Sequence, residues 1–148
     1  MKTIYYLEDD WNYAKLVIAD LNRQAEMENL TWRIIRIPTE SEFISKVSDI
    51  KKGKATTPDV FMLDIMVRFS TPSPEELFEE QAAEAPYDRS GIRCMDLVRK
   101  GFPDCPMILY SVLEEQDLPP SIFNERVSFV AKDSNTKTLF KELCRVLS

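Results

Sequence analysis

The sequence contains no histidine among its 148 residues. This absence excludes imidazole general bases, histidine metal ligands and catalytic Ser–His pairs. Cysteine is scarce: Cys94, Cys105 and Cys144 are an odd number and form no CxxC pair. A disulfide framework or a structural zinc site is therefore not expected, and reduced buried thiols in a cytosolic protein are.

Long apolar runs and an excess of positive charge are also missing. No run of 18 apolar residues exists, and the N-terminus lacks the apolar region of a signal peptide, so we expect a cytoplasmic protein without membrane contact. Lys and Arg total 19 against 25 Asp and Glu, a net charge of −6, which argues against nucleic acid as a partner. The length and the hydrophobic content of 44% indicate one globular domain.

Short apolar runs alternate with stretches of helical spacing along most of the chain. The runs predict strands at residues 4–7, 32–37, 60–63, 107–110 and 127–131. Helices are expected at residues 11–27, 40–51, 92–100 and 136–147. The first has Trp11, Leu16, Val17, Leu21 and Ala25 on its apolar side, and the second has Phe43, Ile44, Val47 and Ile50. Five strands alternating with helices predict a parallel sheet covered on both faces.

Two segments break this alternation. Residues 114–124 should form the fourth helix, but Leu118-Pro119-Pro120 allows only a short or broken one. Residues 68–88 are polar and acidic, and the capping box Ser73-Pro74-Glu75-Glu76 predicts an extra helix over 74–85.

Polar residues follow four of the expected strands. Glu8 and Asp9 follow the first strand, Asp64 the third, Ser111 the fourth and Lys132 the fifth. The carboxyl ends of parallel strands share one edge of the sheet, where ligands bind in open α/β folds. These side chains could therefore converge on one site.

Each of these residues alone has an ordinary explanation. An acidic pair after a strand can complement the dipole of the next helix, and Asp64 alone can be a turn or cap residue. Ser111 alone can be a turn hydroxyl, Lys132 a solvated surface lysine and Phe129 a core aromatic. Only their combination and order point to a common function.

The combination resembles the receiver domain of two-component response regulators. The fragments that carry the resemblance are the Glu8-Asp9 pair and the stretches PDVFMLD, PMILYS and VSFVAK, which end at Asp64, Ser111 and Lys132. The resemblance spans residues 1–148 as a single receiver domain with residues 68–88 as an insertion. It implies a flavodoxin-like (βα)5 three-layer sandwich with strand order 2-1-3-4-5 and an inserted helix between strand 3 and helix 3.

The resemblance also implies the chemistry of the site. Asp64 would be the phosphoacceptor, since a carboxylate can act as a nucleophile and form an acyl phosphate. Mg²⁺ prefers oxygen ligands, and the resemblance implies that Glu8, Asp9, Asp64 and the backbone carbonyl of Met66 bind it. Asp10 has no expected role.

The remaining roles concern the phosphorylated state. The resemblance implies that the Ser111 hydroxyl and the Lys132 ammonium meet the phosphoryl group, which adds about −1.5 to −2 charge. Ser111 and Phe129 would be the switch residues. The implied partners are a histidine kinase or phosphotransfer protein and an unknown downstream protein.

Two features depart from the family pattern. Gly91 lies 27 positions after Asp64, so the loop that carries residues 68–88 is enlarged. Asp133 follows Lys132 where the family has proline in a cis peptide bond. A cis bond before a non-proline residue costs about 3–4 kcal/mol, so either a trans bond with a reshaped loop or a strained bond is expected.

Three functions remain open from the sequence. The first is a stand-alone receiver that catalyses only its own phosphorylation and dephosphorylation and signals through protein contacts. The second is an interaction module that keeps the fold without the phosphorylation cycle. The third is a Mg²⁺-dependent aspartyl-phosphate hydrolase, which is disfavoured because Met66 stands where the second Asp of such enzymes is needed.

Overall fold

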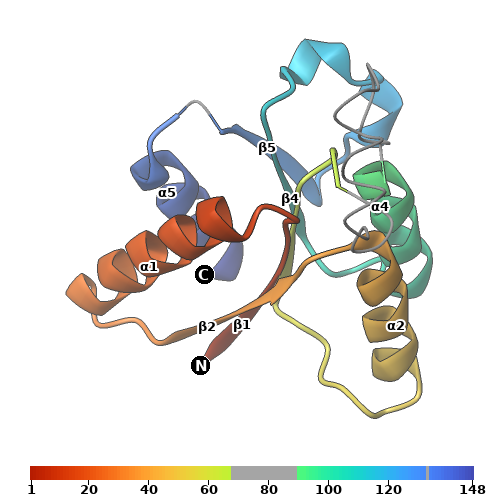
Figure 1. Ribbon diagram of the computed structural model, residues 1–148, viewed down its shortest axis with the longest axis horizontal. Helices are drawn as coiled ribbons and strands as arrows, with labels where there is room; N and C mark the ends of the chain where they lie inside the picture. The colour runs from red at the N-terminus through yellow and green to blue at the C-terminus, as the bar shows by residue number, and fades with distance from the viewer. Residues whose placement is uncertain (68–89, 133) are drawn as a thin grey trace, which may run out of the picture.

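The computed structural model describes residues 1–67, 90–132 and 134–148 (Figure 1). The extra helix expected over 74–85 and the peptide bond between Lys132 and Asp133 lie outside the described residues.

A five-stranded parallel sheet forms the centre of the molecule (Figure 1). Its strands are β1 (Lys2–Leu7), β2 (Trp32–Ile37), β3 (Val60–Leu63), β4 (Met107–Ser111) and β5 (Val127–Ala131). Their order is β2-β1-β3-β4-β5, which confirms the expected topology. The register aligns Leu7, Leu63 and Leu109, which lie at or near the carboxyl ends of three adjacent strands. All three side chains face the same side of the sheet. The polar residues that follow these strands are thereby brought to one edge.

Helices cover both faces of the sheet. α1 (Trp11–Met27) and α5 (Thr136–Leu147) pack on one face, and α2 (Glu40–Lys51) and α4 (Ser90–Gly101) on the other (Figure 1). Successive strand side chains point to opposite faces. In β3, Met62 therefore joins the core beneath α1 and α5, whereas Phe61 and Leu63 join the core beneath α2 and α4.

Side-chain caps set where three of the helices begin. The Asp10 carboxylate accepts from the backbone N–H of Tyr13 at 3.1 Å and caps α1. Thr39 caps α2, and Asn135 caps α5 by accepting from the backbone N–H of Thr138. Such caps satisfy donors that the first helical turn leaves free.

The expected apolar side of two helices is wrong at three positions. Trp11 and Leu16 in α1 are 55% and 70% exposed, and Ile44 in α2 is 42% exposed. The side of α1 that is buried repeats every three or four residues, through Ala14, Val17, Leu21 and Ala25. Leu16 lies about 100° around the helix from Val17, which turns it away from the sheet.

The connection between β4 and β5 contains no regular helix. Two short 3₁₀ turns, η1 (Glu115–Asp117) and η2 (Pro120–Ile122), replace it. The interruption expected at Leu118-Pro119-Pro120 is thus confirmed, because proline cannot continue a hydrogen-bonded helix. Leu118 and Ile122 are buried and anchor this connection to the core.

Within the described residues, we find no helix that combines the length and the apolar character needed to cross a membrane.

Candidate functional site

Three carboxylates meet at the carboxyl edge of the sheet. One oxygen from each of Glu8, Asp9 and Asp64 lies within 4.8 Å of the others. Glu8 and Asp64 are only 1% and 4% exposed, and Asp9 is half-buried. The adjacency of β1 and β3 explains this meeting, since both strands end at the same level.

Lys132 supplies the positive charge of the site. Its ammonium donates to an oxygen of Glu8 and, at 3.0 Å, to Oδ2 of Asp64. Its backbone N–H donates to the carbonyl oxygen of Ser111 at 2.9 Å, which continues the pairing of β5 with β4. The long side chain then reaches past β4 to the acids.

One lysine does not balance the negative charge. Burial raises the pKa of Asp64, and Lys132 opposes this only in part. Burial and then repulsion by Asp64 raise the pKa of Glu8. Burial lowers the pKa of Lys132, but attraction by Asp64 and Glu8 outweighs burial, so the net shift is upward. Raised carboxylate pKa values beside a charged lysine indicate that further positive charge would be stabilised there.

The donor set fits a hard divalent cation. Oxygen ligands from carboxylates are what Mg²⁺ prefers, and it is bound by one or two carboxylates with water and phosphate completing its shell. Glu8, Asp9 and Asp64 could hold such an ion. Met66 lies next to them: its backbone N–H donates to Oδ1 of Asp64 at 3.2 Å.

Ser111 lies at the end of β4, fully buried. Its hydroxyl oxygen accepts from the backbone N–H of Leu113 at 3.3 Å. This bond does not use the hydroxyl hydrogen, which is free to donate to an acceptor. Phe129 lies on β5, partly buried against the core beneath α2 and α4. The switch roles expected for both residues stay predictions.

Arg36 is a site residue that the sequence did not reveal. From β2, its Nε donates to the carbonyl oxygen of Glu8 at 2.8 Å and its Nη2 to that of Asp9 at 2.9 Å. Its guanidinium also lies 5.2 Å from the ring centre of Trp11. The available signal was a charged residue near the end of the strand expected to pair with β1. The sequence could not identify its partners, because they are backbone oxygens, which every residue has.

A cluster of tyrosines borders the acids on the α1 side. Tyr6 and Tyr110 are buried, and Tyr13 is half-buried. The Tyr6 hydroxyl donates to Glu8 at 3.4 Å, and the hydroxyls of Tyr13 and Tyr110 share a hydrogen bond of 2.7 Å. The ammonium of Lys132 lies 4.6 Å from the ring centre of Tyr13 and 5.9 Å from that of Tyr110. The sequence indicates Tyr110 only as a strand residue and gives no sign of this cluster.

Gly91 places the start of α4 directly against the backbone of Asp64. Its N–H donates to the carbonyl oxygen of Ile65 at 2.9 Å. A Cβ at this position would lie 2.1 Å from the carbonyl oxygen of Asp64, which no side chain can tolerate. Glycine is therefore required by close approach.

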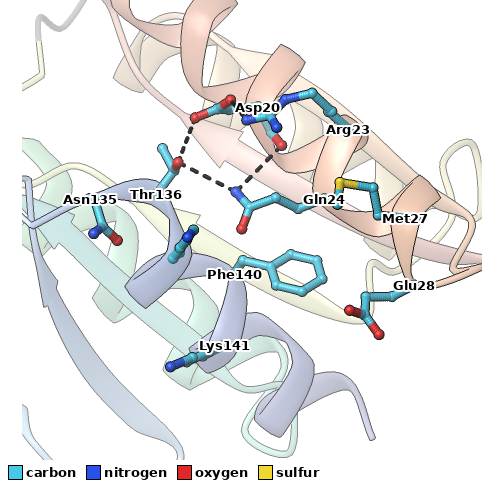
Figure 2. Close-up of a pocket in the computed structure, with 10 residues that line it drawn as sticks. Asp20, Arg23, Gln24, Met27, Glu28, Asn135, Thr136, Phe140 and Lys141 are labelled. Carbon is cyan, nitrogen blue, oxygen red and sulfur yellow. Dashed lines mark hydrogen bonds and ion pairs between the residues drawn. The ribbon is translucent and has the colours of Figure 1, made fainter.

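A cavity of about 670 Å³ lies between α1 and α5, away from the acids (Figure 2). Some of its polar side chains bond to one another: the Thr136 hydroxyl donates to Asp20 at 2.5 Å, and the Gln24 amide donates to Thr136 at 3.4 Å (Figure 2). Phe140 contributes an apolar wall. The cavity holds none of the acidic-site residues, so we consider the acidic site the functional candidate.

Comparison with known proteins identifies the fold. No protein-family profile matches the chain, and no curated protein matches it in sequence. Among solved structures, the BeF3-activated DrrB receiver domain matches with a TM-score of 0.65 and 20% identity over 99% of this chain and 97% of the other. Response regulator TrrA from Thermotoga maritima, in complex with Mg²⁺ and BeF, matches with a TM-score of 0.67 and 19% identity over 99% and 100%. The non-phosphorylated HemR receiver domain from Leptospira biflexa matches at 0.60 and 18% over 100% and 95%. These similarities show that the chain has the receiver fold over nearly its whole length.

Proposed function

We propose that this chain, which has the fold of response regulator receiver domains, is a receiver that accepts a phosphoryl group on Asp64. The observation that carries the proposal is the buried pair of Glu8 and Asp64 bridged by the ammonium of Lys132. Of the three solved structures named above, two are described with beryllium fluoride, and one of these two also with Mg²⁺. We take the chemistry of those proteins as a guide to this one.

The phosphoryl group would come from a phosphohistidine on a histidine kinase or phosphotransfer protein, because this chain has no histidine. An oxygen of Asp64 attacks the phosphorus, the new O–P bond forms, and the N–P bond to the donor histidine breaks. The electron pair of that bond stays on the leaving imidazole. Mg²⁺ held by Glu8, Asp9 and Asp64 would supply positive charge near the transferring phosphoryl group.

Lys132 and Ser111 would then read the phosphorylated state. The phosphoryl group adds about −1.5 to −2 charge. The ammonium that bridges Glu8 and Asp64 can pair with it, and the free hydroxyl hydrogen of Ser111 can donate to it. Pairing of these groups with the phosphoryl group, together with repacking of Phe129, would change the contacts that the protein makes with a downstream protein in the cytoplasm. The chain would be a regulatory domain whose only catalysis is its own phosphorylation and dephosphorylation.

Incubation with a small phosphodonor such as acetyl phosphate tests the proposal. We expect Mg²⁺-dependent addition of one phosphoryl group, detected by intact-protein mass spectrometry. Asp64→Asn should abolish it, and Asp96→Asn, the same change at an exposed position of α4, should not. Failure of the wild type to take up phosphate, or uptake by Asp64→Asn, would overturn the proposal. Equal capture of a partner by wild type and Asp64→Asn would instead support an interaction module that does not use phosphorylation.

We also expect a long-lived acyl phosphate. Met66 and Leu113, two residues beyond Asp64 and Ser111, are apolar and cannot orient a water molecule for attack on the phosphoryl group. Phosphate loss can be followed after the donor is removed. Met66→Asn or Leu113→Glu, which add a group able to hold water, should accelerate the loss. Decay of the wild type within seconds, in the absence of a phosphatase, would contradict this expectation.

A further inference from the structure

The ammonium of Lys132 rests on aromatic ring faces as well as on carboxylates. It lies 4.6 Å from the ring centre of Tyr13 and 5.9 Å from that of Tyr110. Both distances fall within the roughly 6 Å at which a cation is attracted by a ring face. With the two acids, the rings enclose a side chain that is only 10% exposed.

The two tyrosines are themselves fixed in place. Their rings stack at 6.2 Å with 29° between the planes, and their hydroxyls share a hydrogen bond of 2.7 Å. Tyr110 also packs against Tyr6 at 6.4 Å. One ring comes from α1 and the other from β4, so the pair connects the helix to the strand that ends at Ser111.

This arrangement matters because the carboxylate partners of Lys132 change during the proposed reaction. Before transfer the ammonium is bound by Glu8 and Asp64. Afterwards Asp64 carries the phosphoryl group and loses its own charge. The ring faces carry no formal charge that the reaction alters, so they attract the ammonium equally before and after transfer.

We propose that Tyr13 and Tyr110 are positioning residues that hold the Lys132 ammonium over the acidic site in both states. The part of this inference that concerns phosphoryl transfer rests on the proposed function. The residues act through Lys132 and do not themselves touch the phosphoryl group. The ring face is the operative feature, and the Tyr13 hydroxyl is a secondary support.

The test compares Tyr13→Phe, which keeps the ring, with Tyr13→Leu, which removes it. A cation–π contact of this kind is worth about a three- to tenfold change in an equilibrium or rate. We expect Tyr13→Leu to slow phosphorylation by acetyl phosphate at saturating Mg²⁺ about three- to tenfold, and Tyr13→Phe to stay within about twofold. The Mg²⁺ affinity, read from tryptophan fluorescence, should stay unchanged in both.

A double-mutant cycle separates positioning from general destabilisation. In the Lys132→Ala background, Tyr13→Leu should cause no further loss of rate, because its effect passes through Lys132. Tyr5→Leu is the matched control: it removes a buried ring that lies 5.7 Å from Lys46 on the opposite face of the sheet. We expect this control to lower stability without a comparable effect on the rate at a temperature where the variant stays folded.

A second readout needs no phosphorylation. The rate of Lys132 acetylation by acetic anhydride, mapped by peptide mass spectrometry, should rise severalfold in Tyr13→Leu and stay near wild type in Tyr13→Phe. Absence of phosphate uptake by the wild type would refute the proposed function, while the acetylation arms would still decide the positioning of Lys132. The inference would be overturned if Tyr13→Leu slowed phosphorylation by the same factor in the Lys132→Ala background as in the wild type. Equal Lys132 acetylation in wild type and Tyr13→Leu would also overturn it.

Discussion

At the scale of single residues, the site is built from charges placed where water cannot stabilise them. Glu8 and Asp64 are almost fully buried, and one ammonium serves both. Burial raises the pKa of each carboxyl group. The folded protein without a metal ion therefore pays a cost for keeping both groups ionised, and a neutral substitute should relieve it.

Asp64→Asn is expected to raise the free energy of unfolding at neutral pH in the absence of Mg²⁺. Because the pKa of Asp64 is higher in the folded state, stability is fully present below the unfolded pKa and is lost as pH rises through the folded pKa. The difference between variant and wild type should thus be largest near pH 7 and vanish in acid. Thermal melts at several pH values would detect it, at roughly 2–4 °C for each kcal/mol. Asp96→Asn should show no such difference, and a destabilised Asp64→Asn at pH 7 would contradict the prediction.

Arg36→Ala is expected to weaken Mg²⁺ binding by about tenfold, the usual scale for losing a group that orients metal ligands. Arg36 donates to the carbonyl oxygens of both Glu8 and Asp9 and so fixes the loop that carries their carboxylates. Titration with Mg²⁺, followed by fluorescence of the nearby Trp11, would measure the affinity. Arg33→Ala removes an exposed arginine from the same strand and should leave the affinity unchanged. Equal affinities for the two variants would show that the arginine contacts do not organise the site.

At the scale of elements, the site depends on how closely α4 approaches β3. Gly91 lies against the carbonyl oxygen of Asp64, and the first turn of α4 is tied to Ile65 by a backbone hydrogen bond. Glu40 and Arg93 form a paired contact at 2.8 Å that joins α2 to α4. The position of α4 therefore sets the backbone that presents Asp64.

Gly91→Ala is expected to destabilise the fold by about 1–3 kcal/mol, because the added methyl group would overlap the backbone of Asp64 and force α4 outward. The same displacement should reduce phosphorylation of Asp64. Urea unfolding gives the first quantity and mass spectrometry the second.

Gly101→Ala is the matched control for this change. Its Cβ would meet only the flexible end of the Lys51 side chain at 3.0 Å. Alanine favours a helix over glycine by up to about 1 kcal/mol, so this variant should be neutral or more stable. A Gly91→Ala protein as stable as Gly101→Ala would refute the close-approach argument.

At the scale of the whole molecule, the sheet joins the acidic site to both cores. β1, β3 and β4 each alternate between the core beneath α1 and α5 and the core beneath α2 and α4. The tyrosine cluster faces the first core and Phe129 the second. Binding at the edge of the sheet should therefore stabilise the entire fold.

Mg²⁺ is expected to raise the melting temperature of the wild type by about 5–10 °C at a concentration one hundred times its dissociation constant. An ion held by Glu8, Asp9 and Asp64 would bind only their folded arrangement, so mass action would favour the folded state. Asp9→Asn should show a smaller rise because it removes one of the three carboxylates. Thermal melts in metal-free buffer, with and without added MgCl₂, would measure the effect. Asp104→Asn, the same change at an exposed position, is the control. An equal rise in Asp9→Asn and wild type would place the ion elsewhere.

The sequence by itself determined which polar residues follow the strands and in which order they occur along the chain. Apolar runs of strand length end at Glu8, Asp64, Ser111 and Lys132, and an alternating strand–helix pattern requires a parallel sheet with these ends on one edge. The helix bounds followed from the spacing of apolar residues and the caps. The exposed side chains of Trp11, Leu16 and Ile44 were misjudged because residues next to a buried stripe are apolar too, and spacing alone does not show which of them the sheet covers.

Only the tertiary structure decided what surrounds those ends. Arg36 binds backbone oxygens of the acidic loop, and that contact depends on the register of β2 with β1, which composition does not reveal. Tyr13 and Tyr110 meet beside Lys132 because the fold brings α1 close to the end of β4, an outcome of packing between segments 97 residues apart. Gly91 is required by the distance between two backbones. Local sequence encodes which groups reach the edge of the sheet, whereas contacts between distant segments decide how those groups are held.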